Sequence, residues 1–262
     1  MPTALTIAGS DSGGGAGIGA DLKVFSALGV YGTCAITAVT AQNTRAITAQ
    51  AALEPSLVAA QIRAVLEDIG AAAVKTGMLG NGEIVVAVAL ELERWRPPHL
   101  VVDPVLRAST GAELLVGRAV DALKRQLLPL AEVITPNLPE AEALVGRTLV
   151  SESDIRDAAR EMLDFGCSAV LVKGGHRSGP AEDVLFDGHT FEVLRAERLN
   201  APFTHGTGCT FSAALTAELA KGADLFSAAR SAKVFVTEAI RHGFAIGHGP
   251  APVHHLWNVW PA

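Results

Sequence analysis

The chain has 262 residues, of which 49% are hydrophobic and 18% charged, and its formal net charge is −6. This profile is typical of an α/β enzyme rich in small residues, and it excludes a disordered or fibrous chain. The acidic balance offers no basic surface to nucleic acid, and no apolar run could span a bilayer, so we expect neither a nucleic-acid nor a membrane partner.

Short apolar runs alternate with segments of helical periodicity, which predicts a mostly parallel sheet with helices on both faces. The predicted strands are residues 4–8, 32–39, 71–75, 99–102, 132–135, 168–172 and 183–187. The predicted helices are residues 18–28, 55–69, 82–95, 117–128, 139–145, 153–165, 209–221 and 224–241. Residues 182–194 are predicted to form a β-hairpin that turns at Gly188 and His189. No repeat or linker divides the chain, so we expect one domain over residues 1–262.

Polar residues follow five of the predicted strands. In open α/β sheets, ligands bind outside the carboxyl ends of the strands. The five ends are Gly9-Ser10-Asp11, Lys75-Thr76-Gly77-Met78, Asp103-Pro104, Thr135-Pro136-Asn137 and Lys173-Gly174-Gly175. Together they predict a binding site at one edge of the sheet.

The loop after the first strand fits a dinucleotide-binding fingerprint, because Gly15 to Ala20 reads G-x-G-x-x-A. That fingerprint also needs an acid about twenty residues further on for the ribose, but no Asp or Glu occurs from Leu22 to Leu53. A P-loop sequence is absent as well. We therefore interpret the glycines as a loop that approaches a ligand closely.

The segment from Thr204 to Thr210 combines two glycines with the start of an apolar helix. The free N–H groups of a helix start form a seat for an anion, and phosphate is the expected occupant. Cys209 falls in the first turn, where the helix dipole favours a thiolate, so it is a candidate base. Alternatively, Gly206 and Gly208 form an ordinary turn and Cys209 is a small buried residue.

Asp103 and Glu140 are candidate ligands for magnesium, directly or through water. Their alternatives are structural, since Asp103 could start a turn and Glu140 could favour the N-terminus of its helix. Lys173 follows a buried strand and needs an anionic partner. The three cysteines, Cys34, Cys167 and Cys209, have no metal-ligand spacing, and with the lack of a basic leader they favour a cytoplasmic protein.

The ordered motifs resemble the hydroxymethylpyrimidine/phosphomethylpyrimidine kinases of thiamine biosynthesis, within the ribokinase-like superfamily. The matching segments are residues 7–17, 20–23, 38–44, 75–79, 101–105, 135–142, 170–176 and 204–210. The cysteine at position 209 favours this branch, since related sugar kinases have an aspartate there. Two departures from the family pattern are Gly19, where glutamine is common, and the segment Leu106-Arg107-Ala108-Ser109.

The resemblance implies a three-layer α/β/α sandwich, a homodimer, and two successive ATP-dependent phosphorylations of 4-amino-5-hydroxymethyl-2-methylpyrimidine with magnesium. Gln42 would pair with the aminopyrimidine edge, because its amide offers both a donor and an acceptor. The other pocket residues implied are Ala16, Asp21, Val39, Met78 and Val105. The implied catalytic residues are Cys209, Gly206, Gly208 and Lys173, and the implied nucleotide-binding residues are Asn137, Lys173, Thr207 and Lys233.

Four alternatives stay open at this point. Lys233 could be a solvated helix lysine, and Met78 could be plain core. Pyridoxal also presents a hydroxymethyl group on a flat nitrogen ring, so a pyridoxal kinase is the near rival. A nucleotide-binding regulator without catalysis is the more distant one, because a fold alone does not fix function.

Overall fold

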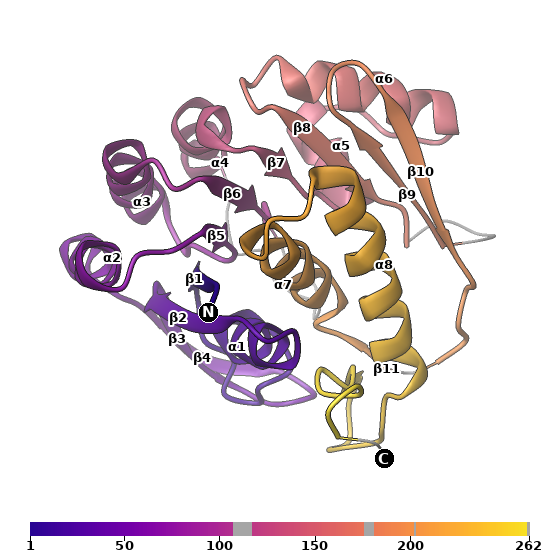
Figure 1. Ribbon diagram of the computed structural model, residues 1–262, viewed down its shortest axis with the longest axis horizontal. Coiled ribbons are helices and arrows are strands. Elements are labelled where there is room, and N and C mark those ends of the chain that lie inside the picture. The colour runs from indigo at the N-terminus through magenta and orange to yellow at the C-terminus, as the bar shows by residue number, and fades with distance from the viewer. Residues whose placement is uncertain (107–116, 176–180, 202, 261–262) are drawn as a thin grey trace.

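The computed structural model describes residues 1–106, 117–175, 181–201 and 203–260. Within them lies an eight-stranded sheet of order β10-β9-β8-β7-β6-β5-β1-β2 (Figure 1). Its strands are β1 (Thr3–Ala8), β2 (Tyr31–Ile36), β5 (Ala73–Thr76), β6 (His99–Val102), β7 (Val133–Ile134), β8 (Ala169–Lys173), β9 (Ala181–Phe186) and β10 (Phe191–Ala196). Strands β1, β2 and β5 to β8 are parallel, while β9 runs antiparallel to both neighbours. The predicted parallel sheet and the predicted hairpin are confirmed.

Helices cover both faces of this sheet, which gives the expected three layers (Figure 1). One face holds α1 (Gly17–Ala27), α7 (Thr207–Ala220) and α8 (Leu225–Arg241). The other holds α2 (Pro55–Asp68), α3 (Gly82–Trp95), α4 (Arg118–Ala122), α5 (Leu138–Val145) and α6 (Glu152–Leu163). The predicted helix at 117–128 is α4 followed by a π-helical turn, Leu123–Leu127, and a 3-10 turn, Leu128–Leu130. Among the described helices, none is long and apolar enough to traverse a bilayer.

Alternation along the strands divides the core in two, because successive side chains of a strand face opposite sides. Leu5 and Ile7 of β1 pack toward α2 and α3, whereas Ala4 packs toward α7. Small residues on the α7 side, such as Ala73 of β5 and Ala169 of β8, let this helix lie close to the sheet. Helix α7 is consequently buried along most of its length, from Thr210 onward.

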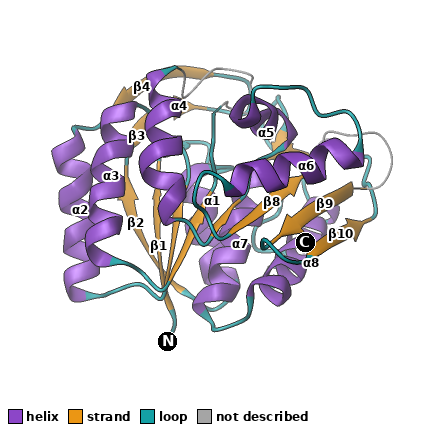
Figure 2. Ribbon diagram, turned by 90° about the horizontal axis from the view of Figure 1, so that it is seen from above, coloured by secondary structure: helices purple, strands orange, loops and turns teal. Residues whose placement is uncertain are grey.

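The predicted strand at 32–39 is wrong in one respect, because it divides at Thr37. This residue is fully buried, and its hydroxyl donates to the carbonyl of Met78 over 2.7 Å. The chain then leaves the main sheet as β3 (Ala38–Gln42), which pairs antiparallel with β4 (Ile47–Ala52) beyond the ends of the parallel strands (Figure 2). A second small pair, β11 (Phe203–His205) with β12 (Ala251–Pro252), was also not predicted.

Candidate functional site

A cavity of about 910 Å³ opens at the carboxyl ends of the parallel strands. Both the predicted anion seat and the predicted heterocycle pocket line it. The predicted residues in its wall are Ala16, Gln42, Met78, Asp103, Val105, Asn137, Glu140, Lys173, Gly206, Thr207, Gly208, Cys209 and Lys233. The five polar strand ends therefore meet in one place, as the sequence predicted.

Two residues expected to line the pocket do not line this cavity. Val39 is 49% exposed, because the side chains of β3 alternate and Thr40 takes the inner position. Asp21 is fully buried on α1, where it accepts a hydrogen bond from Thr6 Oγ1 over 2.6 Å and lies 2.8 Å from Lys75 Nζ. The lysine of this pair lines the cavity in place of the aspartate.

The start of α7 forms a backbone corner that excludes side chains. Gly206 has a φ of 82°, and a Cβ on it would lie 1.8 Å from the carbonyl oxygen of Gly15. The first N–H groups of a helix have no partners within the helix, so those of the residues after Gly206 are available to an anion. A Cβ on Gly208 would lie 3.3 Å from Lys173 Nζ, which places a cation directly beside this corner.

Lys173 and Asp103 form a buried ion pair, with 2.8 Å between Nζ and Oδ1. Asp103 is 2% exposed and also accepts hydrogen bonds from Thr135 Oγ1 at 3.1 Å and Ser212 Oγ at 3.0 Å. Burial opposes the charge of Lys173, but Asp103 and Glu140 attract it more strongly and raise its pKa. Lys173 thus stays positively charged where a phosphate would bind.

Asn137 and Glu140 cap the N-terminus of α5. The Asn137 side chain accepts from the Glu140 N–H over 2.9 Å, and the Glu140 carboxylate accepts from the Asn137 N–H over 2.8 Å. This cap confirms the structural alternative for Glu140, namely that it favours the N-terminus of its helix. Burial raises the pKa of Glu140 to about 7, although Lys173 opposes this change. A cation beside the Glu140 carboxylate would stabilise its charged form and so offset the free-energy cost of burying that charge.

The donor set fits magnesium held mainly by water and phosphate. No group of three or more His, Cys, Asp or Glu side chains forms a metal site within the described ranges. Asp103 and Glu140, which both line the cavity and both attract Lys173, supply hard oxygen ligands. Because Mg²⁺ keeps several waters and is bound by one or two carboxylates together with substrate phosphates, this small set is sufficient.

The surroundings of Cys209 favour the thiol over the thiolate that its place in the first helical turn predicts. Burial raises the pKa of Cys209 to about 11, and Asp21 and Asp103 add to this effect. Lys75 and the backbone of Gly17 lower the pKa of Cys209 but do not compensate for burial. Burial also outweighs the lowering of the thiol pKa that is expected at a helix N-terminus.

Lys233 is not a solvated helix lysine. Its Nζ lies 2.8 Å from Asp183 Oδ2, and Asp183 Oδ1 accepts from the N–H of Gly174 over 3.0 Å. This buried pair joins α8 to β9, and Asp183 also binds the residue that follows β8. Lys233 therefore reaches the cavity with its charge already matched by a carboxylate.

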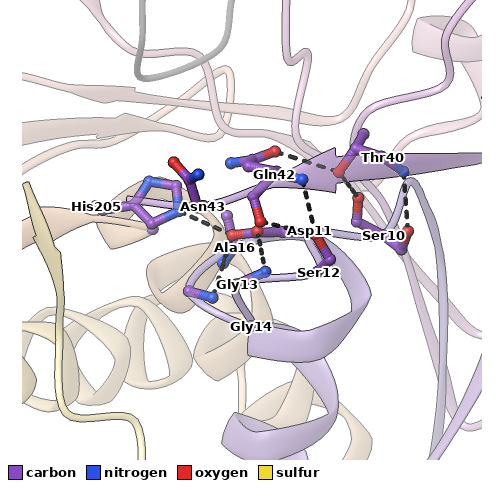
Figure 3. A network of polar contacts seen from close by, with 12 residues as sticks. Ser10, Asp11, Ser12, Gly13, Gly14, Ala16, Thr40, Gln42, Asn43 and His205 are labelled. Carbon is purple, nitrogen blue, oxygen red and sulfur yellow. Dashed lines mark hydrogen bonds and ion pairs between the residues drawn. The ribbon is translucent and has the colours of Figure 1, made fainter. Parts of the chain in front are cut away.

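The loop of residues 10–17 surrounds the carboxylate of Asp11 (Figure 3). Its Oδ1 accepts from Gly13 N–H at 2.8 Å, and its Oδ2 from Ala16 N–H at 3.0 Å and from His205 Nε2 at 2.8 Å. Burial alone would raise the pKa of Asp11, but the bonds from His205 and Gly13 lower it overall. The sequence alone predicts no role for Asp11 or His205. They are 194 positions apart, and only the fold brings them together.

Of the two departures from the family pattern, the structure describes Gly19 and the first residue of the other, Leu106. A Cβ on Gly19 would lie 3.3 Å from Gly14 Cα, so a larger side chain there meets the loop of residues 10–17. Leu106 is buried and lines the cavity. Arg107, Ala108 and Ser109 lie outside the described residues.

Comparison with known proteins identifies the family of the chain. The family model of phosphomethylpyrimidine kinase matches residues 11–254. A hydroxymethylpyrimidine/phosphomethylpyrimidine kinase of Haemophilus influenzae is 51% identical over 257 residues, covering 96% of this chain and 95% of that protein. Among solved structures, an ADP complex of Bacillus subtilis pyridoxal kinase is similar with a TM-score of 0.91 at 42% identity, covering 97% of each chain.

A solved phosphomethylpyrimidine kinase of Clostridium difficile is 43% identical, with a TM-score of 0.82, and the match covers 92% of this chain and all of that one. The fold is thus ribokinase-like, as the motifs implied. The extent of the family match and the identity of these relatives leave one conclusion: the chain belongs to the phosphomethylpyrimidine kinase family.

Proposed function

We propose that this protein phosphorylates 4-amino-5-hydroxymethyl-2-methylpyrimidine with ATP and then phosphorylates the monophosphate to the diphosphate, in thiamine biosynthesis. The observation that supports it most is the position of the corner formed by Gly206, Gly208 and Cys209. It adjoins the Lys173 ammonium, and it shares one cavity with the amide of Gln42 and the side chain of Met78. A phosphate seat and a pocket for a flat heterocycle are what this reaction requires.

In the first turnover, the hydroxymethyl oxygen attacks the γ-phosphorus of ATP. The bond from that phosphorus to the bridging oxygen breaks, and ADP leaves with the electron pair. Cys209 orients the hydroxyl and receives its proton. Burial raises the pKa of Cys209 to about 11, and the nearby Lys75 ammonium favours the thiolate.

Neutralisation of the phosphate charges would contribute more to the rate than proton transfer to Cys209. The backbone N–H groups after Gly206 would stabilise the transferring phosphoryl group, an effect that usually dominates such reactions. Lys173 would neutralise the triphosphate, with Asn137, Thr207 and Lys233 at the nucleotide side of the cavity. Asp103 and Glu140 would hold magnesium through its waters, and the ion would supply further positive charge at the phosphates.

Substrate selection would rest on Gln42 and the loop of residues 10–17. The backbone N–H of Gln42 donates to Ser12 Oγ over 2.7 Å, which fixes the start of its side chain. Ala16, Met78 and Val105 would contact the flat ring. Met78 is suited to this task because its side chain lies over the backbone of Gly9. A Cβ on Gly9 would lie 2.3 Å from Met78 Cε.

A pyridoxal kinase is the second candidate, because a Bacillus subtilis pyridoxal kinase is 42% identical to this chain. Pyridoxal has no amino group beside a ring nitrogen, so it would forfeit the paired hydrogen bonds of Gln42. We expect it to be the poorer substrate. Competition between the two alcohols for limiting enzyme measures this preference.

The test of the function is ADP release by the purified protein with Mg²⁺-ATP and each acceptor. Turnover with hydroxymethylpyrimidine and with its monophosphate is the expected result. Turnover with pyridoxal alone would support the second candidate. ATP binding without turnover of any of these acceptors would support a regulator.

A homodimer and a cytoplasmic location complete the proposal. The first rests on the family resemblance, and the second on composition and cysteine usage. Sedimentation equilibrium of the purified protein distinguishes a dimer from a monomer of 27.1 kDa.

A further inference from the structure

Two segments that lie far apart in the sequence touch through their backbones at the cavity. Gly15 and Gly206 approach so closely that a Cβ on Gly206 would lie 1.8 Å from the Gly15 carbonyl oxygen. A Cβ on Gly15 would lie 2.4 Å from the His205 ring. The relative position of the loop of residues 10–17 and the corner at Gly206 is therefore set by this contact.

One hydrogen-bonded pair fastens the contact. Asp11 and His205 are separated by 194 residues, yet their side chains lie 2.8 Å apart, and both are more than nine-tenths buried. The other donors to Asp11 belong to its own loop, namely the N–H groups of Gly13, Gly15 and Ala16. His205 is thus the donor that ties the organised loop to the segment before α7 (Figure 3).

Both sides of this pair carry groups that face the substrates. On one side, Ala16 and Gly17 both line the cavity, and the backbone of Gly17 lowers the pKa of the Cys209 thiol. On the other side, His205 directly precedes Gly206, the first residue of the anion corner. The distance between the heterocycle pocket and the corner consequently depends on the pair.

We infer that Asp11 and His205 are positioning residues, which set the distance between the hydroxymethyl group of the bound pyrimidine and the transferred phosphoryl group. The inference rests on the proposed function. Neither side chain needs to touch the reacting atoms, because a displacement of about 1 Å between reactants can cost about 100-fold in rate. Lys173 and Lys233, which would bind the nucleotide, are held by other carboxylates, those of Asp103 and Asp183.

The experiment compares three variants of the full chain. His205→Leu removes the donor, His205→Gln keeps an N–H near the position of Nε2, and His99→Leu is the control. His99 forms a similar pair with Glu132, at 2.7 Å, but at the start of β6, away from the carboxyl ends that line the cavity. Far-ultraviolet circular dichroism selects a temperature at which all three are folded.

We expect His205→Leu to lower kcat about 100-fold with both acceptors, while the KM for ATP changes by less than about twofold. His205→Gln should recover at least a tenth of the wild-type kcat, and His99→Leu should match the wild type. In the Asp11→Ala background, His205→Leu should cause no further loss, since the two act as one unit. An unchanged kcat in His205→Leu, or equal losses in the Leu and Gln variants, would overturn the inference.

Amide hydrogen exchange gives a readout that does not need activity. The N–H groups of Gly13, Gly15 and Ala16 should exchange faster in His205→Leu than in His205→Gln, because the loop is released from the corner. Equal protection in these two variants would contradict the inference. Absence of kinase activity in the wild type would instead overturn the proposed function, and the exchange result would still decide whether the pair holds the loop.

Discussion

The ammonium of Lys173 lies 2.8 Å from the carboxylate of Asp103, and both groups are buried beside the anion corner. The pair therefore serves stability and charge neutralisation together. In Lys173→Met, Asp103 keeps only hydroxyl donors, so we expect a loss of about 3–5 kcal/mol of unfolding free energy. Kinase activity at saturating acceptor should fall at least about 100-fold, because a cation at the phosphates is removed.

Lys221→Met is the matched control for this prediction. Lys221 pairs with Glu218 at 2.7 Å near the far end of α7, where it is solvent-exposed. Surface pairs contribute about 0–1 kcal/mol, so urea unfolding and kinase assays should detect little change. A Lys173→Met variant that is as stable and as active as Lys221→Met would contradict the role of the buried pair.

Gly206 is expected to tolerate no side chain. An alanine there combines a positive φ with a clash at 1.8 Å, so the corner must move away from Gly15. We predict a loss of about 100- to 1,000-fold in both phosphorylations, the range seen when anion-stabilising donors are lost. Gly222→Ala tests the backbone effect alone, since Gly222 has a φ of 89° but nothing within 4 Å of its Cβ position. Equal activity of the two alanine variants would show that the close contact is dispensable.

His255 should make the fold sensitive to acid. Burial lowers its pKa from 6.5 to about 4, so between these values the unfolded chain binds a proton that the folded protein does not. Stability from this group is complete above pH 6.5 and decreases as the pH falls toward 4, by about 3 kcal/mol in total. Urea unfolding from pH 7 to pH 4 should show this slope in the wild type and a shallower one in His255→Gln. If the unfolding free energy changed equally with pH in both proteins, the assignment of this slope to His255 would be wrong.

The two phosphorylations should respond differently to pH. The value of kcat/KM reports the pKa values of the free enzyme, and the pKa of Cys209 is about 11. With the alcohol as acceptor, kcat/KM should therefore rise about tenfold for each pH unit between 7 and 9. The monophosphate already has an anionic oxygen, so its kcat/KM should lack this rise. Two superimposable profiles would exclude the thiolate as the base.

Features that depend on local sequence could be predicted. The anion corner follows from Gly206, Gly208 and the apolar helix behind them, and the parallel sheet follows from the alternation of strands and helices. The strand ends at Asp103 and Lys173 meet because parallel strands deliver their carboxyl ends to one edge. These predictions needed no knowledge of distant contacts.

Features that depend on tertiary packing could not be predicted from the sequence. Thr37 diverts the chain out of the sheet through a bond to Met78, and this changes the side that Val39 faces. The pKa of Cys209 reflects how deeply α7 is buried, which outweighs the effect of the helix N-terminus. The contact between Asp11 and His205 joins residues that are 194 positions apart in the sequence, and no local pattern marks it.

The Cys209→Ala variant, assayed separately with hydroxymethylpyrimidine and with its monophosphate, tests the central claim most directly. That claim is that one corner transfers phosphate to two acceptors and that only the alcohol needs a proton acceptor. We predict that alcohol phosphorylation falls about 100- to 10,000-fold, while monophosphate phosphorylation stays within about tenfold of the wild type. Equal losses with the two acceptors would contradict the claim and assign Cys209 to the structure of the corner.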